Sequence, residues 1–167
     1  MMSRDEQIAR AIMKREGWPK VVNDADDLGG LTKGGITYVS AVAFFGPLTR
    51  TQFESLTDND AVVFYTMVHI RPFDTITHAR LREYVIDLGV LRGVRQAVRM
   101  LQAIVGTEVD GWLGPKTRAA ITSFGPAKVL AWCIGARLWH IQTRIDANAT
   151  QAKFRKGWRT RTLSFDV

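Results

Sequence analysis

Glu16 is the residue whose spacing best suits it to donate a proton. It follows Ile8 and Ile12 at intervals of four, so the three side chains share one face of a predicted helix that ends at Gly17. That face is apolar and is therefore expected to turn toward the core. Burial beside apolar neighbours and the partial negative charge of a helix C-terminus both favour the protonated carboxyl. A carboxylic acid that keeps its proton near neutral pH is what general acid catalysis requires.

The segment that follows Glu16 supplies further carboxylates and hydroxyls. Residues 17–37 read GWPKVVNDADDLGGLTKGGIT, and this abundance of Gly and Asp predicts a loop with one small β-hairpin. A buried acid, exposed carboxylates and a hydroxyl on a rigid turn are the parts of a glycosidase site. The candidate polar side chains of the segment are Asp24, Asp26, Asp27, Thr32 and Thr37.

The same residues also allow plainer interpretations. A Glu at a helix end is often solvated, and Asp residues in a loop often form turns or bind calcium. An EF-hand loop needs a Glu at its twelfth position, which falls on Gly35 when counted from Asp24 and on Thr37 when counted from Asp26. The three histidines share no metal-ligand spacing: His69, His78 and His140. We therefore expect neither a metal nor a cofactor.

The elements that must position these side chains are mostly helices. Ser3 and Glu6 have capping-box spacing at the start of the helix that carries Glu16. Further helical patterns run from Thr57 to Val68, over 76–88, from Val94 to Val105, over 115–123 and from Pro126 to Ile145. Trp132 and Trp139 lie seven apart in the last of these, and this spacing predicts that both are in the core. Together the patterns predict a mainly α-helical protein with one small hairpin.

Composition is that of an ordinary globular protein. The 167 residues are 46% hydrophobic and 23% charged, which is enough apolar material for a core. Cys133 is the only cysteine, so no disulfide forms within the chain, and we expect it to be a small buried side chain.

The net charge of +7 is distributed unevenly. Residues 1–60 carry −2, residues 61–136 carry +4 and residues 137–167 carry +5. A basic C-terminal tail indicates a polyanionic partner, either anionic cell wall, anionic lipid or nucleic acid, unless it only aids solubility. The chain has no helix-turn-helix or aromatic-basic platform, so we expect no nucleic acid as a partner.

The stretch from Glu16 to Thr37 resembles the N-terminal signature of glycoside hydrolase family 108. Its start matches Glu16-Gly17, its middle matches Asp27-Leu28-Gly29-Gly30, and its end matches Thr32-Lys33-Gly34-Gly35-Ile36-Thr37. Trp18-Pro19 stands where the signature has Gly-Tyr. The resemblance implies a mainly α, lysozyme-like domain with the hairpin next to the active site. It also implies an enzyme that cuts the glycan strands of peptidoglycan, with Glu16 as the catalytic acid.

A second stretch resembles the predicted peptidoglycan-binding motif that accompanies this family. It comprises Met100-Leu101-Gln102 and the segment from Val109 to Thr117. Locally, Asp110-Gly111 suits a turn and Pro115 suits a first helical position. We therefore expect one domain over 1–167, with a catalytic part over 1–90 and an integrated peptidoglycan-binding-like helical part over 91–167.

These features together predict a peptidoglycan-degrading endolysin of the N-acetylmuramidase type. Glu16 is the predicted general acid. Asp27, or else Asp26, would stabilise the oxocarbenium-like state or orient water, and Thr32 would hold that water. Four more residues are candidate substrate contacts: Thr37, Tyr65, Arg71 and Trp112. Two alternatives remain, namely a lytic transglycosylase that uses the same Glu and a non-catalytic peptidoglycan-binding module.

The sequence also suggests where such an enzyme works. Its N-terminus lacks the apolar stretch of a signal peptide, so we expect synthesis in the host cytoplasm. By family habit, a holin would then give it access to the periplasm or cell wall. The expected partner is bacterial peptidoglycan, the basic tail is a candidate contact for anionic outer-membrane lipid, and the protein is expected to be a monomer.

Overall fold

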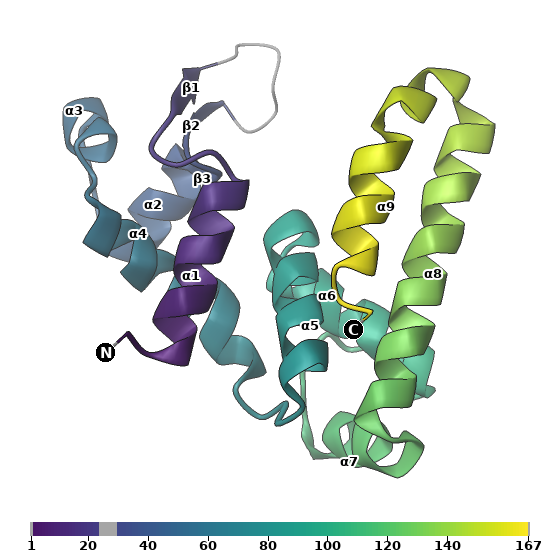
Figure 1. Cartoon of the computed structure of the whole chain (residues 1–167). Coiled ribbons are helices and arrows are strands. Elements are labelled where there is room, and N and C mark those ends of the chain that lie inside the picture. The colour runs from purple at the N-terminus through teal and green to yellow at the C-terminus, as the bar shows by residue number, and fades with distance from the viewer. Residues whose placement is uncertain (1, 24–29, 167) are drawn as a thin grey trace. The chain divides into compact units, whose positions relative to one another are not determined.

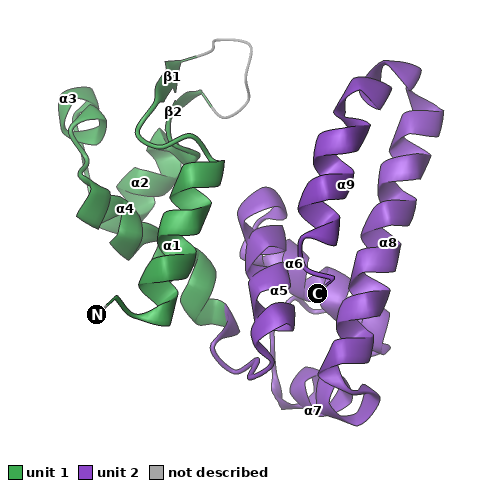
Figure 2. Ribbon diagram, viewed as in Figure 1, with its two compact units in different colours: residues 1–72 green, residues 73–167 purple. Residues whose placement is uncertain are grey.

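The structure, a computed structural model, describes residues 2–23 and 30–166. Its packing divides the chain into two compact units, Met1–Pro72 and Phe73–Val167 (Figure 2). Both units are mainly helical, so the predicted fold class is confirmed. The expected single domain with a functional division after residue 90 stays a prediction.

In its described residues, unit 1 combines a small sheet with four α-helices, of which the one at Tyr38–Phe45 packs on the sheet. Ser3 begins the first helix as expected, since its hydroxyl accepts the backbone N–H of Glu6 at 3.1 Å. Thr57 caps another in the same way, with Asp60 completing a capping box. The helices are α1 (Arg4–Arg15), α2 (Tyr38–Phe45), α3 (Arg50–Glu54) and α4 (Asp58–Tyr65), followed by a π-helix at Thr66–Ile70 and a 3-10 turn at Arg71–Phe73.

The sheet of unit 1 has one strand more than the predicted hairpin. Its strands β1 (Val21–Asn23), β2 (Leu31–Lys33) and β3 (Ile36–Thr37) are antiparallel, in the order β1-β2-β3 (Figure 1). The hairpin predicted around the paired glycines is β2–β3. The extra strand begins with two β-branched residues, Val21 and Val22, which suit an extended backbone although Gly and Asp dominate the segment around them.

Unit 2 is built from longer helices. These are α5 (Ala79–Arg92), α6 (Val94–Val105), α7 (Pro115–Phe124), α8 (Pro126–Ala147) and α9 (Arg155–Leu163), with a 3-10 segment at Ala149–Phe154. The helices α5 and α6 pack most extensively against each other, and both also pack on α8. The last helix, α9, folds back along α8 (Figure 1). Over the described residues no single helix is long and apolar enough to cross a membrane. Only α7 and α8 taken together meet that test, and they are bent by 96°.

The surface of α8 corrects one prediction. Trp132 and Trp139 are 39% and 70% exposed, so the expectation that both lie in the core is wrong. The buried stripe of α8 runs instead through residues such as Val129, Cys133 and Ile141, and neither tryptophan belongs to it. Spacing by seven shows that two residues share a helix face, but it does not show which face packs. Cys133 is buried as expected.

The basic C-terminal segment is part of the fold of unit 2. Thr162 on α9 is fully buried, and the ring of Phe165 packs edge-on against Tyr84 of α5 with centroids 5.6 Å apart. Arg161 of α9 pairs with the buried Asp87 of α5 at 2.9 Å. Deleting this segment would therefore expose core of unit 2, so its charge is better tested by substitution than by truncation.

Candidate active site

Glu16 lies at the C-terminal end of α1, half-buried. Its backbone N–H donates to the Ile12 carbonyl at 2.9 Å and closes the helix. Ile8 and Ile12 are 8% and 1% exposed, so the prediction that they form a buried face leading to Glu16 is confirmed. The carboxyl is therefore carried by the last turn of a helix that the core of unit 1 holds in place.

The Gly34-Gly35 turn between β2 and β3 packs directly against this helix end. A Cβ atom at Gly35 would lie 2.9 Å from the Cβ of Glu16 and 2.9 Å from the Tyr65 hydroxyl, and one at Gly34 would lie 2.7 Å from the Cα of Trp18. Both glycines have positive φ, 51° and 82°. Only glycine satisfies both the conformation and the close approach here. The paired glycines, a weak signal in the sequence, set how closely the hairpin approaches Glu16.

Tyr65, at the end of α4, holds the Gly34-Gly35 turn in place with its side chain. It is 1% exposed, and its hydroxyl donates to the Gly34 carbonyl at 2.7 Å. Burial first, and then the neighbouring Glu16 carboxylate, raise the pKa of Tyr65 well above its ordinary value, so the phenol stays neutral. The predicted role of Tyr65 as a substrate contact does not suit this buried position. The geometry suits a residue that positions the turn beside Glu16.

Trp18 and Lys33 complete the support of the turn, and the sequence interpretation missed the role of both. The indole N–H of Trp18 donates to Asp58 at 2.7 Å, and the Lys33 ammonium lies 4.9 Å from the centroid of the Trp18 ring. Lys33 is 6% exposed and donates to the carbonyls of Glu54 and Leu56 at 2.6 and 2.7 Å. A buried lysine in a strand gives no sequence signal of its own, because its partners are backbone carbonyls distant in the chain.

The two threonines of the hairpin have different surroundings. Thr37 is the N-cap of α2, where its hydroxyl accepts the Ser40 N–H at 3.1 Å and contacts the Ser40 hydroxyl at 2.8 Å. This capping role explains Thr37 without a substrate. Thr32 lies opposite Thr37 in the sheet and is half-buried, and among residues 2–23 and 30–166 its hydroxyl makes only a long contact of 3.5 Å, to the Val22 carbonyl. The described residues therefore engage this hydroxyl weakly.

The other predicted site residues within positions 1–90 are Asp26, Asp27 and Arg71. Asp26 and Asp27 lie outside the described residues. On either side of them in the chain, Asn23 of β1 and Leu31 of β2 pair with each other in the sheet. Arg71 is exposed and belongs to the same unit as Glu16. The choice of a second carboxylate stays a prediction.

The peptidoglycan-motif residues of unit 2 form one hydrogen-bonded network around Gln102. This side chain is 1% exposed, and its amide nitrogen donates to Asp110, to the Trp112 carbonyl and to Thr117 at 2.7, 3.0 and 3.2 Å. Its amide oxygen accepts the Gly111 N–H at 2.8 Å. The hydrogen bond from Gln102, followed by that from the Trp112 N–H, lowers the pKa of Asp110. The polar residues of the motif therefore shape the loop before α7.

Trp112 is what this loop presents to solvent. It is 67% exposed, and its ring covers Gly114, where a Cβ atom would lie 2.7 Å from the ring. An exposed indole on a fixed loop can stack on the apolar face of a sugar. Trp112 belongs to the second unit and Glu16 to the first, and the role of Trp112 as a substrate contact stays a prediction.

Across residues 2–23 and 30–166, no group of three or more His, Cys, Asp or Glu side chains is arranged to hold a metal ion. The aspartates between positions 23 and 30 are not covered by this observation. The described part of the site thus offers one carboxyl, a weakly engaged hydroxyl and a rigid turn, which is chemistry for proton transfer.

A helical fold with a small sheet beside a half-buried Glu is the arrangement of a lysozyme-like glycoside hydrolase. Residues 9–93 match the family described as "Glycosyl hydrolase 108", and residues 96–163 match the one described as "Predicted Peptidoglycan domain". The first match spans half of the chain, so the protein belongs to glycosyl hydrolase family 108. The second match indicates peptidoglycan as the substrate.

One solved structure supports the same fold. The structure of Brucella abortus SagA is 26% identical to this chain, with a TM-score of 0.76, over 96% of this chain and 90% of that one. No curated protein matches the sequence. The similarity covers both units, since it extends over nearly the whole chain.

Proposed function

We propose that the protein is an N-acetylmuramidase that hydrolyses the β-1,4 bond between N-acetylmuramic acid and N-acetylglucosamine in peptidoglycan. The observation that carries this proposal is the position of Glu16, a half-buried carboxyl held between a helix end and the Gly34-Gly35 turn. Family membership supplies the reaction class, and the half-buried position of Glu16 supports it as the acid.

In this proposal Glu16 donates its proton to the glycosidic oxygen while the bond to the anomeric carbon breaks. Asp27, or else Asp26, stabilises the positive charge on the sugar or orients a water molecule. That water adds its hydroxide to the anomeric carbon, and its remaining proton restores the acid form of Glu16. Thr32 helps to hold the water, because its hydroxyl has only a long contact within the sheet.

Binding of the polymer is shared between the two units. Arg71 of the catalytic unit and Trp112 of the second unit are the exposed candidates for holding glycan. Tyr65 and Thr37 contribute by keeping the hairpin and α2 in place, as their hydrogen bonds to Gly34 and Ser40 indicate.

We further propose a phage or prophage endolysin role for the protein. It would be made in the host cytoplasm and would reach the periplasm or cell wall after a holin opens the membrane. It would act as a monomer, and the basic residues near its C-terminus would add attraction to anionic peptidoglycan or anionic outer-membrane lipid.

Product analysis separates this function from its two alternatives. Purified peptidoglycan is digested, reduced with borohydride and analysed by mass spectrometry. Reduced muramic acid ends are expected from an N-acetylmuramidase. Anhydro-muramic ends would instead assign a lytic transglycosylase, and polymer binding without soluble products would assign a non-catalytic binding module.

A further inference from the structure

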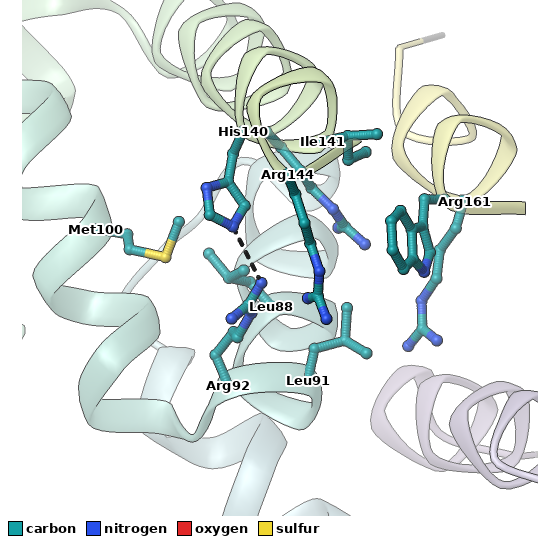
Figure 3. Close-up of a pocket in the computed structure, with 10 residues that line it drawn as sticks. Leu88, Leu91, Arg92, Met100, His140, Ile141, Arg144 and Arg161 are labelled. Atoms are coloured by element: carbon teal, nitrogen blue, oxygen red, sulfur yellow. Dashed lines mark hydrogen bonds between the residues drawn. The ribbon is translucent and has the colours of Figure 1, made fainter. Parts of the chain in front are cut away.

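Unit 2 contains a pocket that is separate from the network of the peptidoglycan motif. It lies between α5, α6, α8 and α9 and has a volume of about 360 Å³ (Figure 3). This is within the range of roughly 300–1,000 Å³ that small-molecule sites occupy. Its lining combines apolar side chains with an unusual number of cations: Leu88, Leu91, Arg92, Met100, Arg137, His140, Ile141, Arg144, Trp158 and Arg161.

The cations of this pocket exceed the carboxylates that face them. Asp87, 1% exposed beneath the pocket, pairs with Arg137 at 3.1 Å and with Arg161 at 2.9 Å. Within the part of the chain that the structure describes, no carboxylate pairs with Arg92 or Arg144. Asp87 thus pairs with two of the four arginines, and the excess positive charge lies on the other two, Arg92 and Arg144, which are exposed.

The two arginines without a carboxylate are nevertheless held in place. The guanidinium of Arg144 lies over the Trp158 ring at 5.1 Å. A guanidinium nitrogen of Arg92 lies 3.4 Å from the Nε2 atom of His140 (Figure 3). Neighbouring like charges weaken a fold when no anion is present. A pocket that keeps such charges in fixed positions is therefore better explained by an anionic ligand than by stability.

We propose that this pocket binds a carboxylate of the peptide stem of peptidoglycan, an inference that rests on the proposed function. Most of the pocket lies within the stretch that matches the predicted peptidoglycan domain. In stem-bearing strands the lactyl carboxyl of N-acetylmuramic acid is amide-bonded to the stem, so the free carboxylates are those of the stems, on short alkyl chains. The planar fork of Arg92 or Arg144 suits a carboxylate, and Leu88, Leu91 and Ile141 provide apolar surface for the alkyl part.

The test uses the full-length protein on two substrates from one wall preparation: glycan strands with their stems, and strands stripped of stems by an amidase and then amidated at the lactyl carboxyl that the amidase exposes. For Arg144→Gln we expect KM to rise about tenfold on the stem-bearing strands, as for loss of one charge-assisted hydrogen bond. The kcat on both substrates and the KM on stripped strands should not change. The control is Arg118→Gln, which removes the same charge from α7, outside the pocket, and should alter neither constant.

A rise in KM that is equal on both substrates, or no rise at all, would overturn the proposal. Thermal unfolding separates binding from folding, because Arg144→Gln relieves repulsion and should not lower the melting temperature. If the wild-type protein cuts neither substrate, the proposed function fails, and calorimetry with the free stem tetrapeptide then tests the pocket alone. Wild-type binding that Arg144→Gln weakens would support the pocket. Absence of binding, or stronger binding of inorganic phosphate than of the tetrapeptide, would contradict it.

Discussion

At the scale of single residues, Gly35 shows that the site depends on the close approach of the Gly34-Gly35 turn to Glu16. A side chain there would collide with Glu16 and with the Tyr65 hydroxyl, and the φ of 82° would strain it. We expect Gly35→Ala to cost roughly 1–3 kcal/mol in the free energy of unfolding from backbone strain. Because the collision also displaces Glu16, kcat should fall by at least about tenfold, as misplacement of a catalytic group does. Steady-state kinetics on purified peptidoglycan measures this.

Gly46 provides the matched control for that substitution. It has a φ of 90° and lies in the same unit, yet nothing lies within 4 Å of where its Cβ would be. Gly46→Ala should therefore lower stability by a similar amount and leave kcat unchanged. Equal losses of kcat in the two variants would show that the turn does not position Glu16.

Single residues were predictable from the sequence only where a local pattern defines them. The place of Glu16 at the end of a buried helix face is predictable, because spacing by four relates it to Ile8 and Ile12, and those two are buried as expected. The sequence does not predict the contact of Tyr65, whose hydroxyl donates to the Gly34 carbonyl of the turn. That contact joins residues 31 positions apart, so no local pattern encodes it. The same holds for Lys33, whose partners are the Glu54 and Leu56 carbonyls.

At the scale of elements, Gln102 connects α6 to the loop before α7. Gln102→Ala removes hydrogen bonds to Asp110, Gly111, Trp112 and Thr117 and leaves buried groups unsatisfied. We expect a loss of about 2–4 kcal/mol in the free energy of unfolding. Binding to insoluble peptidoglycan should weaken as well, because the loop that presents Trp112 loses its support. Chemical denaturation and a pull-down with peptidoglycan measure the two effects.

The control for this prediction lies on the same helix. Gln96 on α6 is exposed, so Gln96→Ala should change stability by less than about 0.5 kcal/mol. If Gln102→Ala were as stable as Gln96→Ala, the motif would not act through this network.

The positions of the helices were predicted better than the packing of the helices against one another. Caps and initial prolines located the helices correctly, as Thr57 and Pro115 show. The predicted helix over 76–88 is displaced to Ala79–Arg92, where His78 caps its start and Gly93 follows its end. The exposure of Trp132 and Trp139 depends on which stripe of α8 meets α5 and α6, and this is a property of tertiary packing that periodicity does not contain.

At the scale of the whole molecule, three buried weak acids predict loss of stability at alkaline pH. Burial raises the pKa of Tyr65 and Tyr84 above 10.0, their ordinary value, and raises the pKa of the Cys133 thiol from 9.0 to about 12. The unfolded chain releases these protons at the lower values while the folded protein keeps them. Stability is therefore full below about pH 9. It falls above about pH 9 because of Cys133 and above about pH 10 because of the two tyrosines as well, by at most about 1.4 kcal/mol per pH unit for each group.

Urea unfolding as a function of pH tests this prediction. Tyr65→Phe removes one of the three groups, so its stability should fall less steeply than that of the wild type above about pH 10. A wild-type stability that stayed constant to about pH 11 would contradict the assigned burial of these groups.

The net charge of +7 predicts attraction to anionic surfaces that salt weakens. Lys156 and Arg159 on α9 are exposed, and Lys156→Gln with Arg159→Gln should weaken binding to vesicles containing anionic lipid at low salt. The control pair is Lys14→Gln with Arg118→Gln, which removes the same charge elsewhere. Equal weakening by both pairs would attribute the attraction to net charge and not to α9.

The central claim is that Glu16 is the proton donor of a peptidoglycan hydrolase, and its most direct test is the cleavage rate of Glu16→Gln beside that of Glu6→Gln. Both residues are half-buried carboxylates of α1, and the carboxylate of Glu6 pairs with Arg10 at 3.0 Å. We predict that Glu16→Gln remains folded and loses about 10²–10⁴-fold in kcat, the usual contribution of a general acid, while Glu6→Gln retains wild-type activity. A folded Glu16→Gln that released reduced muramic acid ends at the wild-type rate would contradict the claim.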